Sequence, residues 1–337
     1  MGTPARIASA RIAVAGSIAN DNLMRFPGRF ADQLVADQLA NVSLSFLVDD
    51  LVVRRGGIGA NIAFGMGVLG CHPVLVGAVG DDFDDYRSWL ERHGVDCSGV
   101  HISELKHTAR FVCTTDDDMC QIAAFYAGAM SEARLIELEP IANRLSGLDL
   151  VMISPDDPQA MLQHAQECRQ RGYPFAVDVS QQLATFDGAQ VRELITGAEY
   201  LFTNEYEWEL LLRKTGWRED DVASRVGIRV TTLGAKGALI VSPDDVPLRL
   251  PSVPETTKAD PTGAGDGFRA GFLAARGHGL GLERAAQLGS LIAVQVLETV
   301  GTQEWIFDRQ EALRRLRDAY GPEAADDIGA ILPGAAG

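Results

Sequence analysis

Short apolar runs rich in β-branched residues alternate with helical stretches along this chain, and that alternation restricts the fold more than any other feature. The runs are "RIAVAGSI" from residue 11, "PVLVGAVG" from 73, "LDLVMIS" from 148, "PFAVDV" from 174, "YLFTN" from 200, "IRVTTLG" from 228 and "ALIVS" from 238. Several are apolar on both faces, as strands buried between two layers are. The alternation predicts an α/β domain with a mostly parallel sheet covered by helices on both faces.

Two segments break this rhythm and are typical of antiparallel strands. They are "NVSLSFLVDDLVVRRGG" from residue 41 and "TARFVCTTDDDMCQIAAFYAG" from residue 108, the second a hairpin that turns near Asp117. Together they predict a small sheet outside the main one, placed as a lid over the strand ends. We therefore expect one domain over residues 11–320, with lid inserts at about 22–55 and 104–128 and flexible termini at 1–10 and 330–337.

Charge and composition exclude several classes of partner. The formal net charge of −16 opposes binding to nucleic acid or to an anionic membrane surface. No apolar segment reaches the roughly 18 residues that a membrane span needs, so a cytoplasmic protein is expected. The five cysteines include no C-x-x-C pair, which argues against a zinc site. The first run continues as "AGSIAND" and not as G-x-G-x-x-G, which argues against a dinucleotide-binding dehydrogenase.

A glycine-rich segment, "DPTGAGDGFRAGF", occupies residues 260 to 272 at the start of a helical pattern. A tight connection alone explains such glycines, because glycine accepts backbone angles that other residues resist. The alternative is an anion site made by the free amides of Ala264, Gly265 and Asp266 at a helix N-terminus. A carboxylate beside a bound phosphate makes sense if Asp266 accepts the proton of an attacking hydroxyl during phosphoryl transfer.

Four motifs in order resemble the ribokinase (PfkB) family of sugar and nucleoside kinases. They are "GGIGANIAFGMGVLG" from residue 56, the N-x-x-E element from residue 204, "TLGAKG" from residue 232 and "DPTGAGD" from residue 260. Within that family, "GSIANDNLMRFPGRF", "VSLSFLVDDLV", "DVSQQLA" and "GTQEW" resemble bacterial adenosine kinases. The resemblance implies a ribokinase-like three-layer sandwich with a β-sheet lid, and an ATP-dependent kinase that works as a homodimer formed through the lid.

The resemblance also implies roles for residues around the acceptor hydroxyl. Asp266 corresponds to the catalytic base, and the backbone of Gly263, Ala264 and Gly265 to the group that stabilises charge on the transferring phosphoryl group. The implied substrate-binding residues are Ser17, Asp21, Gly56, Gly57 and Asn61. Asp21 would accept hydrogen bonds from ribose hydroxyls; its structural alternative is a helix cap or a turn residue.

ATP and metal ions have implied positions as well. The implied ATP-binding residues are Asn204, Thr232, Gly234, Gly237 and Gly265. Glu207 would organise Mg²⁺ through water, since Mg²⁺ keeps much of its hydration; the alternative is an ordinary acidic helix start. Asp260 corresponds to a K⁺ site, although Pro261 replaces the threonine of the usual family loop and removes an N–H.

Aromatic and amide side chains favour adenosine over a sugar. Gln181 and Gln182 bring neutral amides that match the edge of a purine. If the hairpin turns about Asp117, Phe111 and Phe125 are diagonal neighbours on one face, where they would stack on a base or else only pack the lid. We expect phosphorylation of the adenosine 5′-hydroxyl by ATP. The alternatives are a sugar kinase of the same family and a catalytically silent nucleotide-binding protein.

Overall fold

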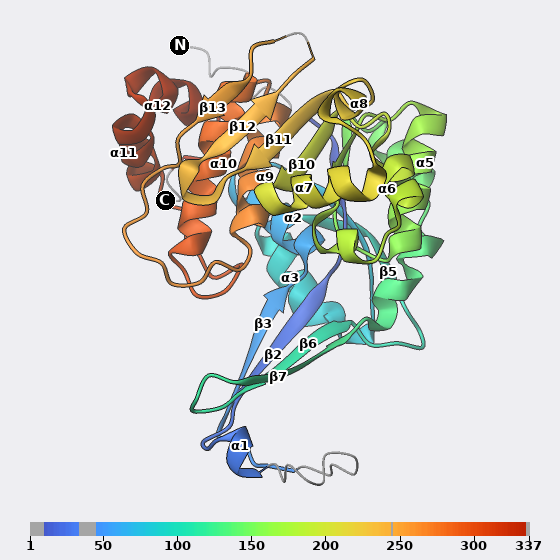
Figure 1. Ribbon diagram of the computed structural model, residues 1–337, viewed down its shortest axis with the longest axis vertical. Helices are drawn as coiled ribbons and strands as arrows, with labels where there is room; N and C mark the ends of the chain where they lie inside the picture. Colours follow the sequence, from blue (N-terminus) through green and yellow to red (C-terminus); the bar gives the residue numbers. More distant parts are fainter. Residues whose placement is uncertain (1–9, 34–44, 244, 335–337) are drawn as a thin grey trace.

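The computed structural model describes residues 10–33, 45–243 and 245–334. Within them, a nine-stranded sheet has the order β13-β12-β11-β10-β9-β8-β1-β4-β5 (Figure 1). Its strands are β1 Ile12–Ala15, β4 Val74–Val79, β5 Asp96–Ile102, β8 Leu150–Ile153, β9 Phe175–Asp178, β10 Tyr200–Asn204, β11 Ile228–Thr232, β12 Ala238–Val241 and β13 Leu248–Leu250. The neighbouring strands β11, β10, β9, β8, β1, β4 and β5 are parallel to one another. Strand β12 is antiparallel to both of its neighbours, β11 and β13. The predicted mostly parallel sheet is therefore confirmed.

Helices cover both faces of this sheet. They are α2 Ile58–Val68, α3 Asp84–Arg92, α4 Leu138–Leu145, α5 Pro158–Arg171, α6 Gly188–Ile195, α7 Glu205–Thr215, α8 Glu219–Ala223, α9 Ala264–Gly277, α10 Leu282–Leu297, α11 Arg309–Tyr320 and α12 Pro322–Gly329. One apolar core joins the sheet to α2, α3 and α9–α12, and a second joins it to α4–α8. Strand β1 is buried on both sides because Ile12 and Val14 enter the first core while Ala13 and Ala15 enter the second.

Local signals at the ends of α5 explain why that helix has its observed bounds. The side chain of Asp157 accepts hydrogen bonds from the amides of Gln159 and Ala160, both at 3.1 Å, which satisfies two N–H groups of the first turn. At the other end Gly172 adopts a left-handed conformation with φ of 72°, which ends the helix without steric cost.

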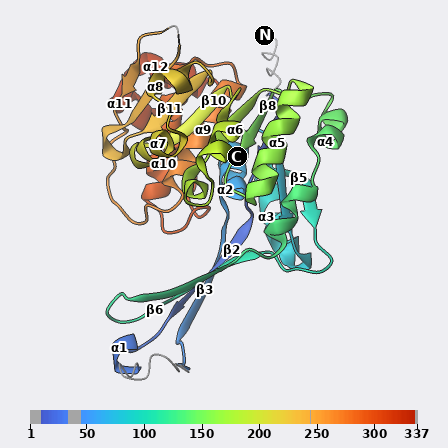
Figure 2. The ribbon, with the colours of Figure 1, turned by 45° about the vertical axis from the view of Figure 1, so that its right-hand side comes forward.

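A small four-stranded sheet with the order β3-β2-β6-β7 projects from the body (Figures 1 and 2). Its strands are β2 Ala19–Arg25, β3 Asp50–Gly56, β6 Ala109–Thr115 and β7 Gln121–Tyr126. Strand β2 is parallel to β6 and antiparallel to β3, and β6 is antiparallel to β7. The short helix α1 Phe30–Gln33 lies at the far end. The chain crosses from β1 into this sheet within three residues, so Asp21 belongs to a strand and not to a turn.

The predicted register of the hairpin was wrong by two residues. Phe111 lies directly opposite Phe125, and not diagonal to it, because the turn is centred on Asp118. The side chain of Asp116 holds this turn by accepting from the amides of Asp118 at 3.0 Å and Cys120 at 2.8 Å. A shift of two residues keeps every side chain on its predicted face, so both rings still share one face.

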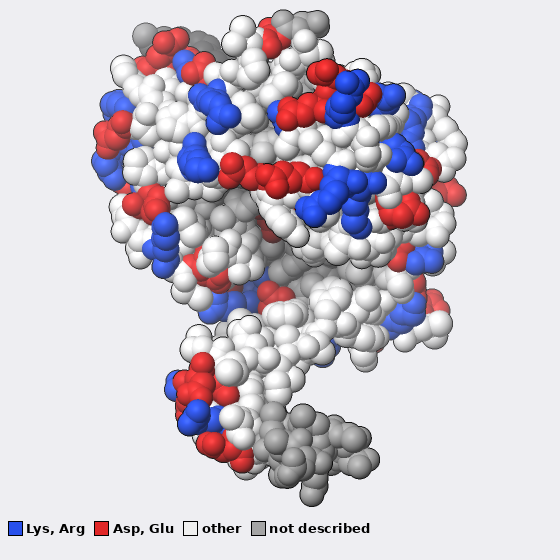
Figure 3. All heavy atoms as spheres, in the orientation of Figure 1, with Lys and Arg blue, Asp and Glu red and all other residues white. Residues whose placement is uncertain are grey.

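Charged groups are spread over the surface of the body. Figure 3 shows acidic and basic side chains interspersed over one face, and a hollow where the small sheet joins the body. In the part of the chain that the structure describes, helices are too short or too polar to cross a membrane. Parts of the predicted flexible termini, residues 1–9 and 335–337, and part of the first lid insert, 34–44, lie outside the described residues.

Candidate active site

A cavity of about 870 Å³ lies where the carboxyl ends of the parallel strands face the small sheet. This edge of a parallel sheet is where ligands bind in open α/β folds. The predicted residues that line the cavity are Ser17, Asp21, Gly56, Gly57, Asn61, Phe111, Phe125, Gln181, Gln182, Asn204, Glu207, Thr232, Gly234, Asp260, Gly263, Gly265 and Asp266. Residues separated by up to 249 positions in sequence, from Ser17 to Asp266, thus meet at one site.

A second cavity of about 370 Å³ adjoins the first and shares Thr232, Gly234 and Gly265 with it. Two further predicted residues, Gly237 and Ala264, line only this second cavity. The glycine at 237 is required by the fold itself, because a Cβ there would lie 1.9 Å from the carbonyl oxygen of Leu250. The two cavities together offer room for two ligands that meet at the start of α9.

The start of α9 has some, but not all, of the free amides expected of an anion-binding site. Gly263 precedes the helix with φ of 78°, and a Cβ there would lie 2.7 Å from Cγ2 of Thr302. Of the three amides expected to be free, that of Ala264 donates to the Pro261 carbonyl at 3.3 Å. Among the described residues no backbone acceptor is recorded for the amides of Gly265 and Asp266. Two amides therefore stay available to an anion.

Asp266 sits half-buried in the first turn of α9, beside these amides. Burial raises its pKa to about 7, against the lowering effects of a hydrogen bond from Asn61 and of the nearby Arg269 guanidinium. Asn61 Nδ2 donates to Asp266 Oδ2 at 2.9 Å. A carboxylate with a pKa near neutrality is matched to accept a proton from a hydroxyl at physiological pH.

Asn61 occupies the fourth position of α2 and is almost fully buried. Its Oδ1 accepts from Thr302 Oγ1 at 3.0 Å and from Gln303 Nε2 at 2.9 Å, so the carboxamide bridges two parts of the protein to Asp266. The sequence suggested a direct contact to the sugar, and that role stays a prediction. What the structure adds is a contact with the candidate base.

A buried ion pair beneath Asp266 was not predicted. Arg269 Nε lies 2.6 Å from Asp178 Oδ2, and the two side chains are only 6% and 2% exposed. Arg269 Nη2 donates to Asp178 Oδ1 at 2.8 Å and Nη1 donates to the Gly265 carbonyl at 2.9 Å. The one available signal was an arginine within the apolar run "GFRAGFLAA", since a charged residue on a buried helix face needs a partner.

Two further acidic groups that line the cavity, Asp21 and Asp156, have raised pKa values. Burial raises the pKa of Asp21 to about 6, although the positive charge of Arg54 on β3 opposes this. Asp156, which follows β8, was also missed by the sequence reasoning; burial raises its pKa to about 8. Arg54 and Asp156 both line the cavity.

The predicted metal residues have structural contacts of their own. Asn204 and Glu207 form a capping box at the start of α7, with Glu207 Oε2 accepting from the Asn204 amide at 2.7 Å. Asp260 accepts from the amides of Thr262 at 2.9 Å and Gly301 at 3.3 Å, which orders its own loop. The second oxygen of Glu207 has no recorded partner among the described residues. Binding of Mg²⁺ through Glu207 and of K⁺ through Asp260 stays a prediction.

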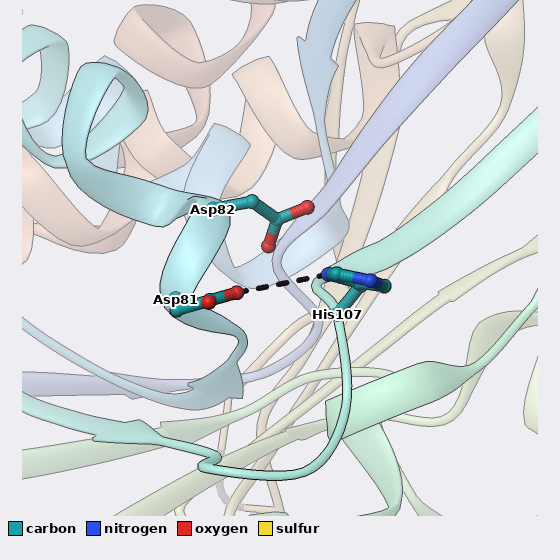
Figure 4. A group of neighbouring side chains, drawn as sticks. All are labelled: Asp81, Asp82 and His107. Carbon is teal, nitrogen blue, oxygen red and sulfur yellow. Dashed lines mark ion pairs between the residues drawn. The ribbon is translucent and has the colours of Figure 1, made fainter.

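A separate group of potential metal ligands lies at the base of the small sheet (Figure 4). Asp81 Oδ1 is 3.6 Å from His107 Nδ1, and Asp82 is the third member. Asp82 is already used: its Oδ1 accepts from the amide and the hydroxyl of Thr108, and its Oδ2 pairs with Arg110. Through these contacts Asp82 connects the body to the start of β6, which gives the group a structural role.

Comparison with known proteins gives one consistent family. Residues 24–308 match the pfkB family of carbohydrate kinases. A nucleoside kinase of Methanothermobacter thermautotrophicus is 32% identical over 294 residues, which are 85% of this chain and 92% of that protein. The ligand-free nucleoside kinase of Burkholderia thailandensis is 36% identical with a TM-score of 0.83, covering 90% of this chain and 99% of that one.

The Burkholderia enzyme has also been solved in complex with inosine. That structure is 35% identical with a TM-score of 0.79, and the match covers 92% of this chain and 99% of the other. The fold is therefore ribokinase-like, and the activity is that of an ATP-dependent phosphotransferase with a hydroxyl acceptor. The resemblance carried by the four sequence motifs is confirmed: the chain belongs to the pfkB family of carbohydrate kinases.

Proposed function

We propose that this protein is an adenosine kinase, which transfers a phosphoryl group from ATP to the 5′-hydroxyl of adenosine and releases AMP and ADP. The observation that carries the proposal is the pair of phenyl rings on the small sheet. Phe111 and Phe125 lie directly opposite each other on neighbouring strands and both line the large cavity. Phe125 is 55% exposed, so its face is free to stack on a planar base.

Gln182 supports an adenine base in particular. Its Nε2 donates to the Asp156 carbonyl oxygen at 2.7 Å, which fixes the amide orientation and leaves Oε1 as the acceptor. An acceptor matches the 6-amino group of adenine. The inosine complex of the Burkholderia relative favours a second candidate, a purine nucleoside with a 6-oxo group. Such a base presents an acceptor at that position, which Gln182 in this orientation would repel.

The two adjoining cavities support positions for the proposed reacting groups. The nucleoside would occupy the large cavity, with its ribose hydroxyls near Asp21, and ATP the smaller one along Thr232 and Gly234. The 5′-hydroxyl and the transferring phosphoryl group would then meet at the start of α9. Asp266 would accept the hydroxyl proton, and the free amides of Gly265 and Asp266 would stabilise the phosphoryl charge.

Kinases of this family use ATP with a divalent metal ion, generally Mg²⁺. The residues fit that ion: Glu207 lines the large cavity with one carboxylate oxygen unused among the described residues, and Mg²⁺ prefers carboxylate and water oxygens. We propose that Glu207 and Asn204 hold the hydrated ion, which would neutralise charge on the phosphates. Neither residue would act in proton transfer.

The direct test is incubation with Mg²⁺ and ATP against a panel of adenosine, inosine, other nucleosides, ribose and fructose, with products identified by mass. Adenosine is expected to give AMP with the largest kcat/KM of the panel. Efficient phosphorylation of ribose or fructose without that of adenosine would replace the proposal by a sugar kinase. Binding of ATP without turnover of any acceptor would indicate a silent nucleotide-binding protein.

Replacing Phe125 by alanine is expected to weaken adenosine binding about tenfold and ribose binding little, because only the nucleoside has a base to stack. One base–aromatic contact is worth on the order of 1–3 kcal/mol in single-stranded nucleic acids, and 1.4 kcal/mol is a factor of ten. Calorimetry with adenosine and with ribose measures both affinities. Tyr126→Ala is the matched control, since Tyr126 neighbours Phe125 on β7 and points to the opposite face. Equal losses for both ligands would show that the ring only packs the sheet.

Replacing Glu207 by glutamine is expected to raise the Mg²⁺ concentration for half-maximal activity about tenfold, the usual scale for a group that orients metal-bound water. Glutamine keeps an oxygen for the capping box with Asn204, so the helix start is preserved and only the charge is tested. Activity is measured over a Mg²⁺ titration at fixed ATP. Glu209→Gln, on the exposed side of α7, is the control. A titration that coincides with wild type would leave Glu207 as a helix cap only.

A further inference from the structure

The residues Gln303 and Trp89 line up behind Asn61, on the side away from the large cavity. Trp89 Nε1 donates to Gln303 Oε1 at 3.1 Å, Gln303 Nε2 donates to Asn61 Oδ1 at 2.9 Å, and Asn61 Nδ2 donates to Asp266 Oδ2 at 2.9 Å. We propose that Gln303 and Trp89 are positioning residues that fix the orientation of the Asn61 carboxamide, so that Asp266 always receives a hydrogen bond from it. The proposal rests on the proposed function in so far as Asp266 is the proton acceptor.

The direction of this chain of hydrogen bonds is set at its outer end. An indole nitrogen is a donor only, so the group that faces Trp89 must be the oxygen of Gln303. With that oxygen fixed, Nε2 of Gln303 faces Asn61 and requires an oxygen there. The Asn61 oxygen is therefore turned away from Asp266 and its NH₂ group toward it. Inverting Asn61 alone would place two donors against each other within a buried site.

Gln303 is the main hydrogen-bond donor to Asn61 Oδ1, because the other neighbouring donor, Thr302, is shared with a second acceptor. The Thr302 hydroxyl has a single proton, for which Asn61 Oδ1 at 3.0 Å and the Arg55 carbonyl at 3.1 Å compete. Gln303 Nε2 makes a further bond of 2.6 Å to the Tyr86 hydroxyl, which in turn donates to the Gly56 carbonyl at 2.8 Å. Gln303 thus joins Asn61 to the Gly56–Gly57 backbone, and it is 1% exposed.

The orientation of Asn61 affects the pKa of Asp266, because a hydrogen-bond donor to a carboxylate favours its ionised form. The other charged groups that act on Asp266 are Arg269, one turn further along α9, and Asp178 on β9; the first favours ionisation and the second opposes it. Asp21 and Glu207 line the same cavity. Losing the Asn61 donor, or turning the Asn61 oxygen toward Asp266, would raise the pKa of Asp266 above its present value.

Three variants at two positions, Gln303 and the more distant Trp89, test the proposal. Gln303→Glu presents an acceptor to Asn61 and would invert it, Gln303→Met removes both hydrogen-bonding groups at similar volume, and Trp89→Phe removes only the indole donor. Trp305→Phe is the matched control. Trp305 lines the same surface cavity as Trp89 and packs against Phe64, and no hydrogen bond is recorded for its indole nitrogen among the described residues.

The readout that does not depend on turnover is the titration of the Asp266 carboxyl carbon by NMR, assigned through its loss in Asp266→Asn. The midpoint is expected to rise by about one pH unit or more in Gln303→Glu, less in Gln303→Met and least in Trp89→Phe. It should not move in Trp305→Phe. If Gln303→Glu does not fold, Gln303→Met and Trp89→Phe carry the test.

Kinetics give the second readout, with the best acceptor found in the panel. In Gln303→Met, kcat/KM should fall at pH 6 and recover toward wild type by pH 9, whereas a merely structural defect would lower it equally at all pH values. Midpoints that coincide with wild type in Gln303→Met and Gln303→Glu would overturn the inference. A shifted NMR midpoint without any shift in the kinetic profile would confirm the positioning role and reject Asp266 as the base.

Discussion

Replacing Asp266 by asparagine is expected to lower kcat by about 100-fold or more while leaving both substrates bound, in line with the usual contribution of a general base. Asparagine has the same size, and its oxygen can still accept the bond from Asn61 Nδ2, so the local packing is retained. What it loses is the ability to take the hydroxyl proton. Steady-state kinetics together with calorimetric binding of nucleoside and ATP separate the loss of chemistry from a loss of affinity.

The raised pKa of Asp266 also predicts the direction in which kcat/KM changes with pH. Burial raises the pKa of Asp266 to about 7, and only the ionised form accepts a proton. In the wild type kcat/KM should therefore fall as the pH drops below about 7, and this acidic limb should disappear in Asp266→Asn. Asp308→Asn is the control, because Asp308 caps α11 and asparagine caps equally well. An Asp266→Asn variant that keeps more than a tenth of the wild-type kcat would show that Asp266 is not the base.

Replacing Arg269 by methionine is expected to destabilise the protein by about 3–5 kcal/mol, the usual cost of removing one partner of a buried ion pair. Asp178 would be left as a buried carboxylate without its partner, with a side chain that is 2% exposed. Urea unfolding measures the loss. Adding Asp178→Asn to Arg269→Met should recover most of it, because the unpaired charge is then gone. Arg314→Met, at an exposed pair with Glu311 and Asp318, should change little.

The loss in Arg269→Met should depend on pH. Burial already raises the pKa of Asp178 from 3.8 to about 6 against the attraction of Arg269, and removal of the guanidinium raises it further. A carboxyl whose folded pKa lies above its unfolded value destabilises the fold increasingly as pH rises between those two values. Relative to wild type, the variant should therefore be weakest at pH 8 and recover toward pH 4. An equal loss at both pH values would point to lost packing and not to the orphaned charge.

Much of the architecture could be predicted because its signals are local. All seven apolar runs form strands of the large sheet, since burial between two helical layers requires residues that are apolar on both faces, as in β1. The remaining two strands, β5 and β13, were not anticipated: β5 carries polar residues such as Asp96 and Ser98, and β13 has only three residues. Their positions depend on neighbouring strands and not on their own pattern.

Within the candidate site, the sequence alone determined many of the residues that gather and the chemistry that they suggest, because motifs at strand ends and helix starts have fixed local geometry. It determined neither how these residues contact one another nor what holds them in place. The register of the hairpin depends on the Asp116 carboxylate, which holds the turn. The buried arginine beneath Asp266 depends on the ion pair of Arg269 with Asp178. The orientation of the Asn61 carboxamide depends on Gln303, which lies 242 positions away in the sequence. Such contacts form only when distant segments pack, and the hydrogen-bonding needs of each buried polar group then select a single arrangement.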